Sequence, residues 1–400
     1  MPDEISFPGV FVEEQGGGRT IAGVETSIAA FVGRTALGLV NEPILVTSFA
    51  GFEREFGGLS ADLPLTYAVR DFFENGGSKA LIVRLTRIDG RETDELDIPS
   101  YLGNEEEKAG IYALLKADIF NLLCIPPDRQ AGDVPPLIYQ EALSFCVAQR
   151  AMLLVDPPAE WTGTADVAVA KALAGLVGLG LSEPAGRNAA MYFPRVLEFD
   201  PMRNGETGKF APCGVVAGII ARTDAQKGVW SAPAGIETAI NGVAGLDVVL
   251  NDDQNGSLNS DGINCLRTFN GIGNVVWGAR TLRGSDQIDD PYKYVSVRRL
   301  SLFIEESLQR GLQWAVFEPN NEVLWSAIRQ SVNNFMTDLF LRGAFLGTAA
   351  SQAFFVNCDS STTTQTDIEN GIVNILIGFA PIKPAEFVII RLQQMVMQPD

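Results

Sequence analysis

The stretch DIFNLLCIPPDRQAGDVPPLIYQEALSFCVAQRAMLLVDPP, residues 118–158, decides the fold of this chain. It predicts an apolar strand at 118–126, a helix at 136–150 and a second apolar strand at 151–158. Two strands joined through a helix form the repeating unit of a parallel sheet. The same alternation continues with a helix at 164–180, a strand at 187–195 and a helix at 213–228. We therefore expect a doubly wound α/β domain in the middle of the chain.

The N-terminal part predicts a smaller set of elements. Ser48 is the expected N-cap of a short Phe-rich helix, and Ser60 is the expected N-cap of a longer helix that ends at Asn75. From Asp89 the sequence becomes polar and acidic, which indicates a crossing into another domain. Short apolar strands are expected at three places: 28–32, 42–48 and 79–85.

The C-terminal part predicts two amphipathic helices and a terminal strand. The longer helix carries an apolar stripe, and Phe340 and Leu341 fall off it. Large apolar side chains outside the buried stripe often mark a partner surface. The expected elements are a loop-like region at 235–273, a return strand at 274–284, a helix at 297–311, a strand and turn at 312–321, a helix at 322–343 and a strand at 384–396.

These elements predict a chain of two parts. Residues 21–88 and 278–400 are expected to form one discontinuous α+β inner domain. Residues 89–277 are expected to form an inserted α/β domain, and residues 1–20 a separate strand with a glycine tether.

Composition excludes several classes of function. The chain has 400 residues, a formal net charge of −19 and no histidine. The negative charge disfavours nucleic acid and anionic membranes, and the missing histidine removes Ser-His-Asp and Cys-His nucleophile systems. The start has neither a basic nor an apolar segment, so no signal peptide is expected, and no apolar run is long enough to cross a bilayer. The five cysteines are scattered singly and are interpreted as buried thiols in a reducing cytosol: Cys124, Cys146, Cys213, Cys265 and Cys358.

Two short motifs have a chemical and a structural interpretation. Gly271 and Gly273 resemble part of a nucleotide-binding loop, but they precede a strand, which favours a simple turn. Asp252 and Asp253 offer oxygen ligands for Ca²⁺, but the spacing of an EF-hand is missing, which favours a solvated turn. No phosphate-binding GxxxxGK[ST] loop occurs. We expect no catalytic residue, cofactor site or metal site.

The two chain ends carry strand patterns that need a partner sheet. A lone apolar strand is unstable in water, because its backbone groups need a neighbour. Each strand either pairs with its own domain or adds itself to the sheet of another subunit. The N-terminal candidate is Val10, Phe11, Val12 and Glu13, followed by the tether Gly16, Gly17 and Gly18. The C-terminal candidate is Phe387, Val388, Ile389, Ile390 and Leu392.

Longer motifs give the chain a resemblance to a known family. They include FPGVFVEE (7–14), TSIAAFVGRT (26–35), VTSFAGFEREFGG (46–58), LTYAVRDFFENGGSKALIVRL (65–85), VSVRRLSLFIEESLQRGLQWAVFEPNNEVLW (295–325) and PAEFVII (384–390). These motifs resemble the contractile phage tail sheath family, which includes the sheaths of extracellular injection systems and bacteriocin-type tails. The resemblance extends from about Phe7 to about Leu392.

The resemblance implies a structural protein. Members of this family form six-fold rings that stack around an inner tube and contract to drive the tube through a target envelope. It implies that terminal strands of different subunits join the sheet of a third, with Gly16 to Gly18 as a pliable tether. The implied partners are other copies of the chain, the inner tube protein, the baseplate and the tail terminator. Nucleic acid, direct membrane insertion and cofactors are not implied.

The resemblance also implies a place for the chain and for its tube contact. The chain is expected in the cytoplasm of the producing cell and then in a phage tail or tail-like particle. The long helix is the expected tube contact, through Arg329, Asn333 and Phe340. Two alternatives remain open: a sheath component of a type VI-like secretion apparatus, and an enzyme that uses the inserted domain.

Overall fold

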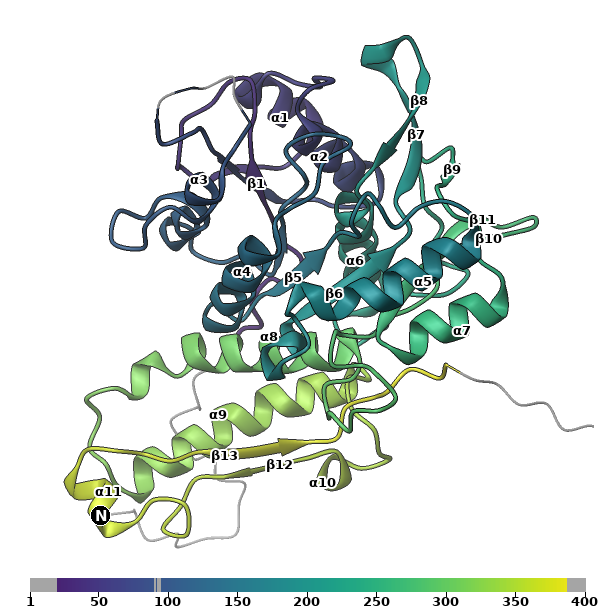
Figure 1. Ribbon diagram of the computed structural model, residues 1–400. Helices are drawn as coiled ribbons and strands as arrows, with labels where there is room; N and C mark the ends of the chain where they lie inside the picture. Colours follow the sequence, from purple (N-terminus) through teal and green to yellow (C-terminus); the bar gives the residue numbers. More distant parts are fainter. Residues whose placement is uncertain (1–19, 90, 92–94, 387–400) are drawn as a thin grey trace, which may run out of the picture. The chain divides into compact units, whose positions relative to one another are not determined.

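The protein, described by a computed structural model over residues 20–89, 91 and 95–386, divides into two compact units (Figure 1). The α/β unit contains residues 25–303 and 382–386, and the C-terminal unit contains residues 20–24 and 304–381. Helix α8 (Val295–Gly311) runs through the boundary, so its residues from Ile304 onward belong to the C-terminal unit.

An eight-stranded sheet forms the centre of the α/β unit, in the order β11-β10-β6-β5-β4-β1-β3-β2. The six inner strands run parallel, while the edge strands β2 and β11 run antiparallel to their neighbours. In the register, Phe31 faces Ile82 on one side and Cys124 on the other. The strands are β1 (Ala29–Gly33), β2 (Ile44–Val46), β3 (Ala80–Arg84), β4 (Leu122–Cys124), β5 (Met152–Val155), β6 (Ala189–Phe193), β10 (Ile263–Phe269) and β11 (Gly273–Val276).

Helices cover both faces of this sheet, because its strands are apolar on both sides. Along β1 the side chains alternate: Ala29 and Phe31 join one buried cluster, and Ala30 and Val32 join the other. The first face carries α1 (Phe49–Phe56), α2 (Pro64–Glu74) and α6 (Cys213–Lys227). The second face carries α3 (Ile98–Leu102), η1 (Gly110–Lys116), α4 (Pro136–Ala148), α5 (Ala165–Leu176) and α7 (Asp252–Ser260), with the short turns η2 (Val177–Leu179) and η3 (Pro184–Asn188).

Helices α2 and α6 approach each other so closely that their backbones touch. A Cβ on Gly214 would lie 2.1 Å from the carbonyl oxygen of Ala68, and a Cβ on Gly218 would lie 2.5 Å from that of Phe72. The two glycines are four residues apart, so both face α2 from one side of α6. They fix the spacing between the two helices.

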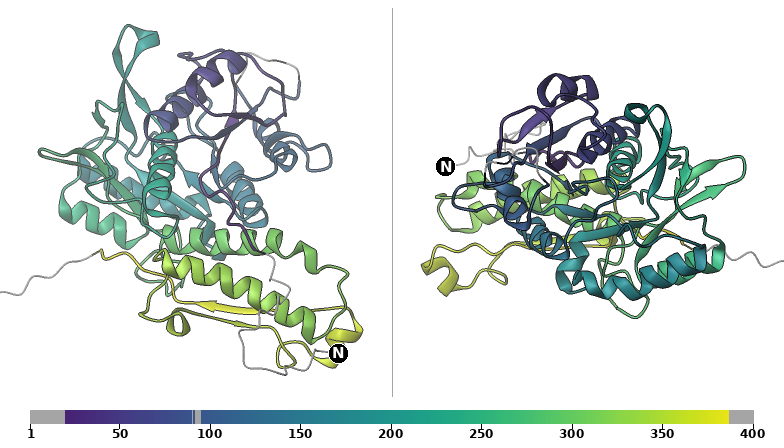
Figure 2. Two further views of the ribbon diagram at one scale, coloured as in Figure 1. Left: turned by 180° about the vertical axis from the view of Figure 1, so that it is seen from behind. Right: turned by 45° about the horizontal axis from the view of Figure 1, so that its top comes forward.

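A second, three-stranded sheet projects from the α/β unit as a hairpin with one added strand (Figure 2). Its order is β8-β7-β9, and Asp200 pairs with Glu206 at the tip. Its elements are β7 (Val196–Asp200), η4 (Pro201–Arg203), β8 (Glu206–Phe210) and β9 (Gly245–Leu246).

The C-terminal unit is built around the long helix α9 (Glu322–Leu341). Asn321 caps its first turn with its side-chain oxygen, and the expected apolar stripe is buried at Leu324, Ile328, Val332, Phe335 and Leu339. The remaining elements are η5 (Gln313–Ala315), α10 (Ala350–Ala353), β12 (Phe354–Asn357), α11 (Gln365–Glu369) and β13 (Leu376–Phe379).

The domain boundaries differ from those expected from the sequence. Strand β1 pairs with both β3 and β4, so residues 29–84 lie in the same sheet as the middle of the chain. Residues 25–88 therefore form one unit with the middle of the chain and with residues 278–303, separate from residues 304–381, and the α/β sheet does not begin at 89. The expectation failed because residues 29–33 and 80–84 are short apolar strands. Their sequence pattern is the same whether they belong to a small mixed sheet or to a large parallel sheet.

Three local expectations are also corrected. Helix α2 begins with Pro64 after Leu63, not with a cap at Ser60, because proline fits the first helical turn. The loop-like region 235–273 contains α7 and β10. Residues 312–321 contain η5 in place of a strand, and no strand of the described residues pairs with them.

Other sequence expectations are confirmed. All five cysteines are buried free thiols. Ser48 caps α1, and its Oγ accepts from the backbone of Gly51. Gly271 lies in the turn between β10 and β11, and Gly273 begins β11; both have positive φ.

Candidate assembly interface

The two strands expected to be exchanged lie outside the described residues. This holds for Val10 to Glu13, for the tether Gly16 to Gly18 and for the strand from Phe387 to Leu392.

Strands β12 and β13 form a two-stranded antiparallel sheet in the C-terminal unit. Phe354 pairs with Phe379, and Asn357 pairs with Leu376. Among the described residues neither strand has a further strand partner, although Phe345 forms an isolated bridge with Pro381 just past the end of β13. Most of both long edges of this sheet therefore presents unpaired backbone groups. An isolated two-stranded sheet is marginally stable, and an added strand at either edge would complete it.

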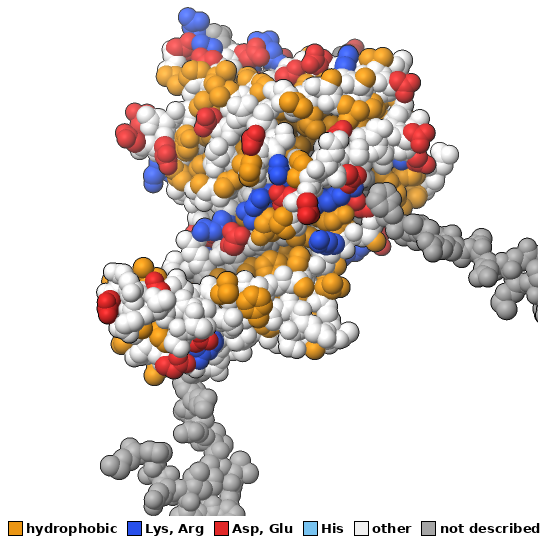
Figure 3. Space-filling view, turned by 60° about the horizontal axis from the view of Figure 1, so that its bottom comes forward, with side chains coloured by type: hydrophobic (Ala, Val, Ile, Leu, Met, Phe, Trp, Pro, Cys, Tyr) orange, Lys and Arg blue, Asp and Glu red, His pale blue; other side chains and the backbone are white. Residues whose placement is uncertain are grey.

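The surface of this small sheet is partly apolar. Phe355 and Leu376 are 49% and 54% exposed. Helix α9 contacts β12 on the buried side, where Phe345 packs against Phe354 and Phe379 with ring centroids 6.1 and 5.5 Å apart. In Figure 3, the lower-left part of the molecule shows hydrophobic side chains among white atoms, with a few charged side chains at its edges. Such a surface suits main-chain pairing with an apolar strand.

The three residues expected to contact the tube lie on one face of α9. Arg329, Asn333 and Phe340 are separated by four and seven residues, which places them within about 40° around the helix axis. The face is not free: Arg329 Nη2 donates to Glu322 Oε1 at 2.6 Å, and Nη1 donates to the carbonyl of Cys358. Asn333 and Phe340 are half-buried, while the neighbouring Leu341 is 76% exposed.

A buried ion pair holds the residue just before the C-terminal strand candidate. Arg280 is 1% exposed, and its Nε and Nη2 donate to the two carboxylate oxygens of Glu386 at 2.7 and 2.6 Å. Its Nη1 donates to Asp286 and to the carbonyl of Asn259. Burial alone would raise the pKa of Glu386, but the hydrogen bonds and charge of Arg280 hold it below its usual value. These contacts anchor Glu386 to the α/β unit.

A second buried ionisable cluster joins the β7–β8 hairpin to α2. Arg70 contacts Asp71 at 2.8 Å and also Glu198, while the Tyr67 hydroxyl donates to Asp200 at 2.6 Å. Burial, followed by the charge of Asp71, raises the pKa of Glu198 to about 10. Glu198 therefore carries a proton at neutral pH beside the carboxyl group of Asp71. These groups point into the protein, so their role is to hold the hairpin.

Within the described ranges, the structure offers no group of three or more His, Cys, Asp or Glu side chains placed to hold a metal ion. The acidic pair considered for Ca²⁺ lies in the first turn of α7, where Asp252 accepts from Arg267 at 2.7 Å. The helices in those same ranges include none that is long and apolar enough to span a membrane.

Sequence reasoning missed the β12–β13 sheet and the Arg280–Glu386 pair. Both strands of the sheet have four residues, which is too short for a periodic signal. Arg280 and Glu386 are 106 residues apart, and no local pattern connects them.

Comparison with known proteins identifies relatives along the chain. A family model described as the phage tail sheath protein central domain matches residues 140–282, and one described as the phage tail sheath C-terminal domain matches residues 287–395. Together they match more than half of the chain. A prophage major tail sheath protein of Pseudomonas aeruginosa is 26% identical over 392 residues, which cover 92% of this chain and 91% of the relative. The tail sheath protein of Enterobacteria phage T4 is 26% identical over 171 residues, which cover 42% of this chain and 24% of that protein.

Solved structures match over almost the whole length. A sheath complex of the extracellular contractile injection system PVC, in its contracted state, has a TM-score of 0.75 and 26% identity, with 98% of both chains covered. The helical sheath of the anti-feeding prophage in its contracted state has a TM-score of 0.73 and 27% identity, with 97% of this chain and 99% of that chain covered. The six-fold symmetrised baseplate of the same particle has a TM-score of 0.72 and 27% identity, with 98% and 99% covered.

Proposed function

Because this chain belongs to the contractile phage tail sheath family, we propose that it is a structural subunit of a contractile sheath that assembles from copies of itself around an inner tube. The observation that carries this function is the end-to-end structural match to subunits of contracted sheaths. The relatives compared are phage-tail and extracellular-injection sheaths, which favours this class over a type VI-like sheath and over an enzyme.

Assembly proceeds by strand exchange in this proposal. The sheet β12–β13 accepts the strand around Val10 to Glu13 from one neighbour and the strand around Phe387 to Leu392 from another. Two unpaired edges, one on each strand, support two acceptor positions. Gly16 to Gly18 then form the flexible link that keeps the first strand inserted while subunits rotate.

The C-terminal unit, with the acceptor sheet and α9, faces the tube in this proposal. Six-fold rings stack into a metastable extended sheath between a baseplate and a tail terminator. Contraction forms new interfaces and releases the stored free energy without a nucleotide. The subunit is made in the cytoplasm of the producing cell and ends in a phage tail or tail-like particle.

Electron microscopy of the protein expressed alone, beside sedimentation, tests this function. Wild-type protein is expected to form striated hollow tubes of contracted-sheath type. A variant that lacks residues 1–18 should remain folded, with unchanged circular dichroism, but should sediment as a monomer because the donated strand is missing. Normal sheaths from this deletion would contradict strand donation.

The tether is tested by two matched triple substitutions. Replacing Gly16, Gly17 and Gly18 with three serines preserves flexibility, and sheaths should form as in the wild type. Replacing them with three prolines stiffens the link without changing its length, and assembly or contraction should fail. If both variants behave alike, the tether is not a hinge.

A further inference from the structure

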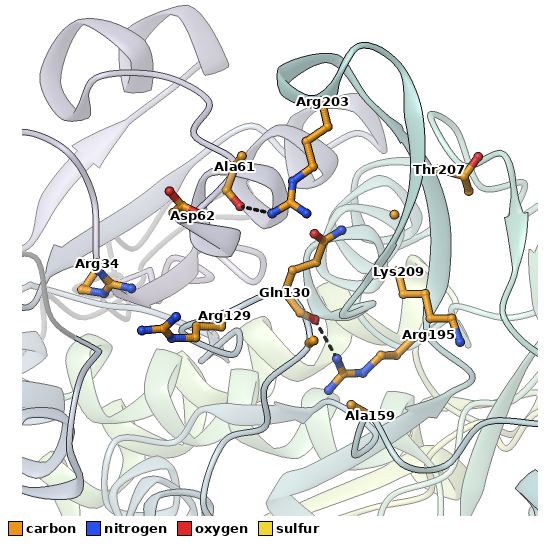
Figure 4. Close-up of a pocket in the computed structure, with 12 residues that line it drawn as sticks. Arg34, Ala61, Asp62, Arg129, Gln130, Ala159, Arg195, Arg203, Thr207 and Lys209 are labelled. Carbon is orange, nitrogen blue, oxygen red and sulfur yellow. Dashed lines mark hydrogen bonds between the residues drawn. The ribbon is translucent and has the colours of Figure 1, made fainter.

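A cleft of about 720 Å³ opens at the carboxyl ends of the parallel strands of the α/β unit (Figure 4). Arg34 follows β1, Arg129 follows β4 and Arg195 follows β6. The β7–β8 hairpin contributes Arg203 and Lys209 to another wall. In open α/β sheets this end is the usual place for a binding site.

The walls of the cleft carry an excess of positive charge. Five cationic side chains line it, against one lining carboxylate, Asp62. This contrasts with the whole chain, in which 49 acidic residues outnumber 30 basic ones. A concave cationic surface on an acidic protein attracts negatively charged groups.

Each of the five cations is held in place by a carboxylate. Three of them pair with carboxylates whose side chains are at most 9% exposed: Arg34 with Asp128, Arg203 with Asp200, and Lys209 with Asp247. Arg195 is 5% exposed and donates to the carbonyls of Gln130, Gly132 and Pro157 and to Asp133. The side chains of Arg129, Arg203 and Lys209 are 63%, 46% and 50% exposed. The other two carboxylate partners are more exposed: Glu95, which pairs with Arg129 at 2.7 Å, is 51% exposed, and Asp133 is 46% exposed.

The chain itself contains a complementary group. Glu105, Glu106 and Glu107 are the one run of three consecutive acidic residues in the sequence. All three are exposed in a turn between α3 and η1. Figures 1 and 2 show the loop after α3 on the side of the α/β unit away from the β7–β8 hairpin. The turn therefore does not reach the cleft of its own subunit.

We propose that the cationic cleft binds the Glu105–Glu107 turn of a second copy of this chain. The inference rests on the proposed sheath function and adds a contact between α/β units to the strand exchange. Because the two surfaces lie at different places on one unit, the contact is head-to-tail, and repetition produces a ring or a helix. It also supplies a local attraction between subunits that otherwise repel through their net charge of −19.

Charge reversal on each side of the contact tests the proposal. R129E/R203E inverts exposed cations in the cleft, and E105K/E106K/E107K inverts the turn. Each variant alone should lose about tenfold or more of its assembled fraction in sedimentation, because like charges then face each other. An equimolar mixture should recover assembly, since alternating subunits restore opposite charges at every contact.

The control is Lys227→Glu, at the end of α6. Lys227 is 51% exposed and pairs with a carboxylate, Glu237, so it matches the cleft cations in exposure and pairing. This variant should assemble as the wild type does, and all variants should keep the wild-type circular dichroism. If R129E/R203E assembles at the wild-type level, or if the mixture stays unassembled, the proposed cleft contact is wrong. The proposed sheath function is unaffected by either result. Wild-type protein that forms no ring or sheath overturns the proposed function together with the contact.

Discussion

At the scale of single residues, Glu198 couples stability to pH. Burial and the neighbouring charge of Asp71 raise the pKa of Glu198 to about 10 in the folded protein, from 4.5 in the unfolded chain. Unfolding between these values releases a proton, so stability falls as pH rises through that window, by at most about 1.4 kcal/mol per pH unit. Glu198→Gln keeps a neutral donor beside Asp71 and cannot ionise. We expect the melting temperature of the variant to exceed that of the wild type increasingly from pH 5 to pH 9.

The same substitution at Glu206, exposed on the neighbouring strand β8, is the control for this residue. It should leave the pH profile of the melting temperature unchanged. A Glu198→Gln variant whose melting profile runs parallel to that of the wild type would show that Glu198 is ionised in the folded protein.

At the scale of elements, the contact between α2 and α6 depends on glycine. Gly218→Ala places a Cβ 2.5 Å from a backbone oxygen that cannot move without displacing α2, so we expect a loss of about 1–3 kcal/mol in the free energy of unfolding. Gly256→Ala in α7 is the matched control, because nothing lies within 4 Å of its Cβ and alanine favours a helix by about 1 kcal/mol. Denaturant unfolding should thus move in opposite directions for the two variants. Equal shifts would contradict the close packing of α2 and α6.

Elements with strong local patterns were predictable from the sequence, and those fixed by distant partners were not. Residues 136–148 and 322–341 combine apolar stripes with clear ends, and both form the expected helices. Helix α7 has one buried residue, Leu258, so its sequence carries no apolar stripe that would predict a helix. The one local signal is the capping box that Asn251 and Gln254 form at its start. The short strands β12 and β13 are defined by each other across 18 intervening residues, from Cys358 to Ile375.

At the scale of the whole molecule, the Arg280–Glu386 pair connects the α/β unit to the C-terminal strand candidate. Glu386→Gln leaves the buried guanidinium with a neutral partner, which weakens the two-pronged contact. We expect the subunit to fold and the yield of sheaths to fall several-fold, measured by sedimentation and microscopy. Lys383→Gln, exposed three residues earlier, should assemble normally. Equal yields for both variants would mean that the pair does not serve assembly.

The organisation of the molecule was less predictable than its local elements. The sequence motifs pointed to the sheath family over nearly the full length, and the comparisons confirm the family. The division into units came out differently because β1 and β3 belong to the large parallel sheet. Sheet order depends on contacts between distant residues, which a single sequence does not display.

The ion pair between Arg280 and Glu386 also determines how a pulling force on the C-terminal strand would enter the subunit. If a neighbour holds the strand that follows Glu386, a pull on it reaches two hydrogen bonds that share the load. From Arg280 the load passes to Asn264 on β10, whose side chain bonds both the backbone N–H and the carbonyl of Arg280. Strand β10 pairs with β6 inside the large sheet. A terminal strand anchored in this way would pull on the central sheet of the α/β unit and not on a surface loop, so the load would enter this unit through its core.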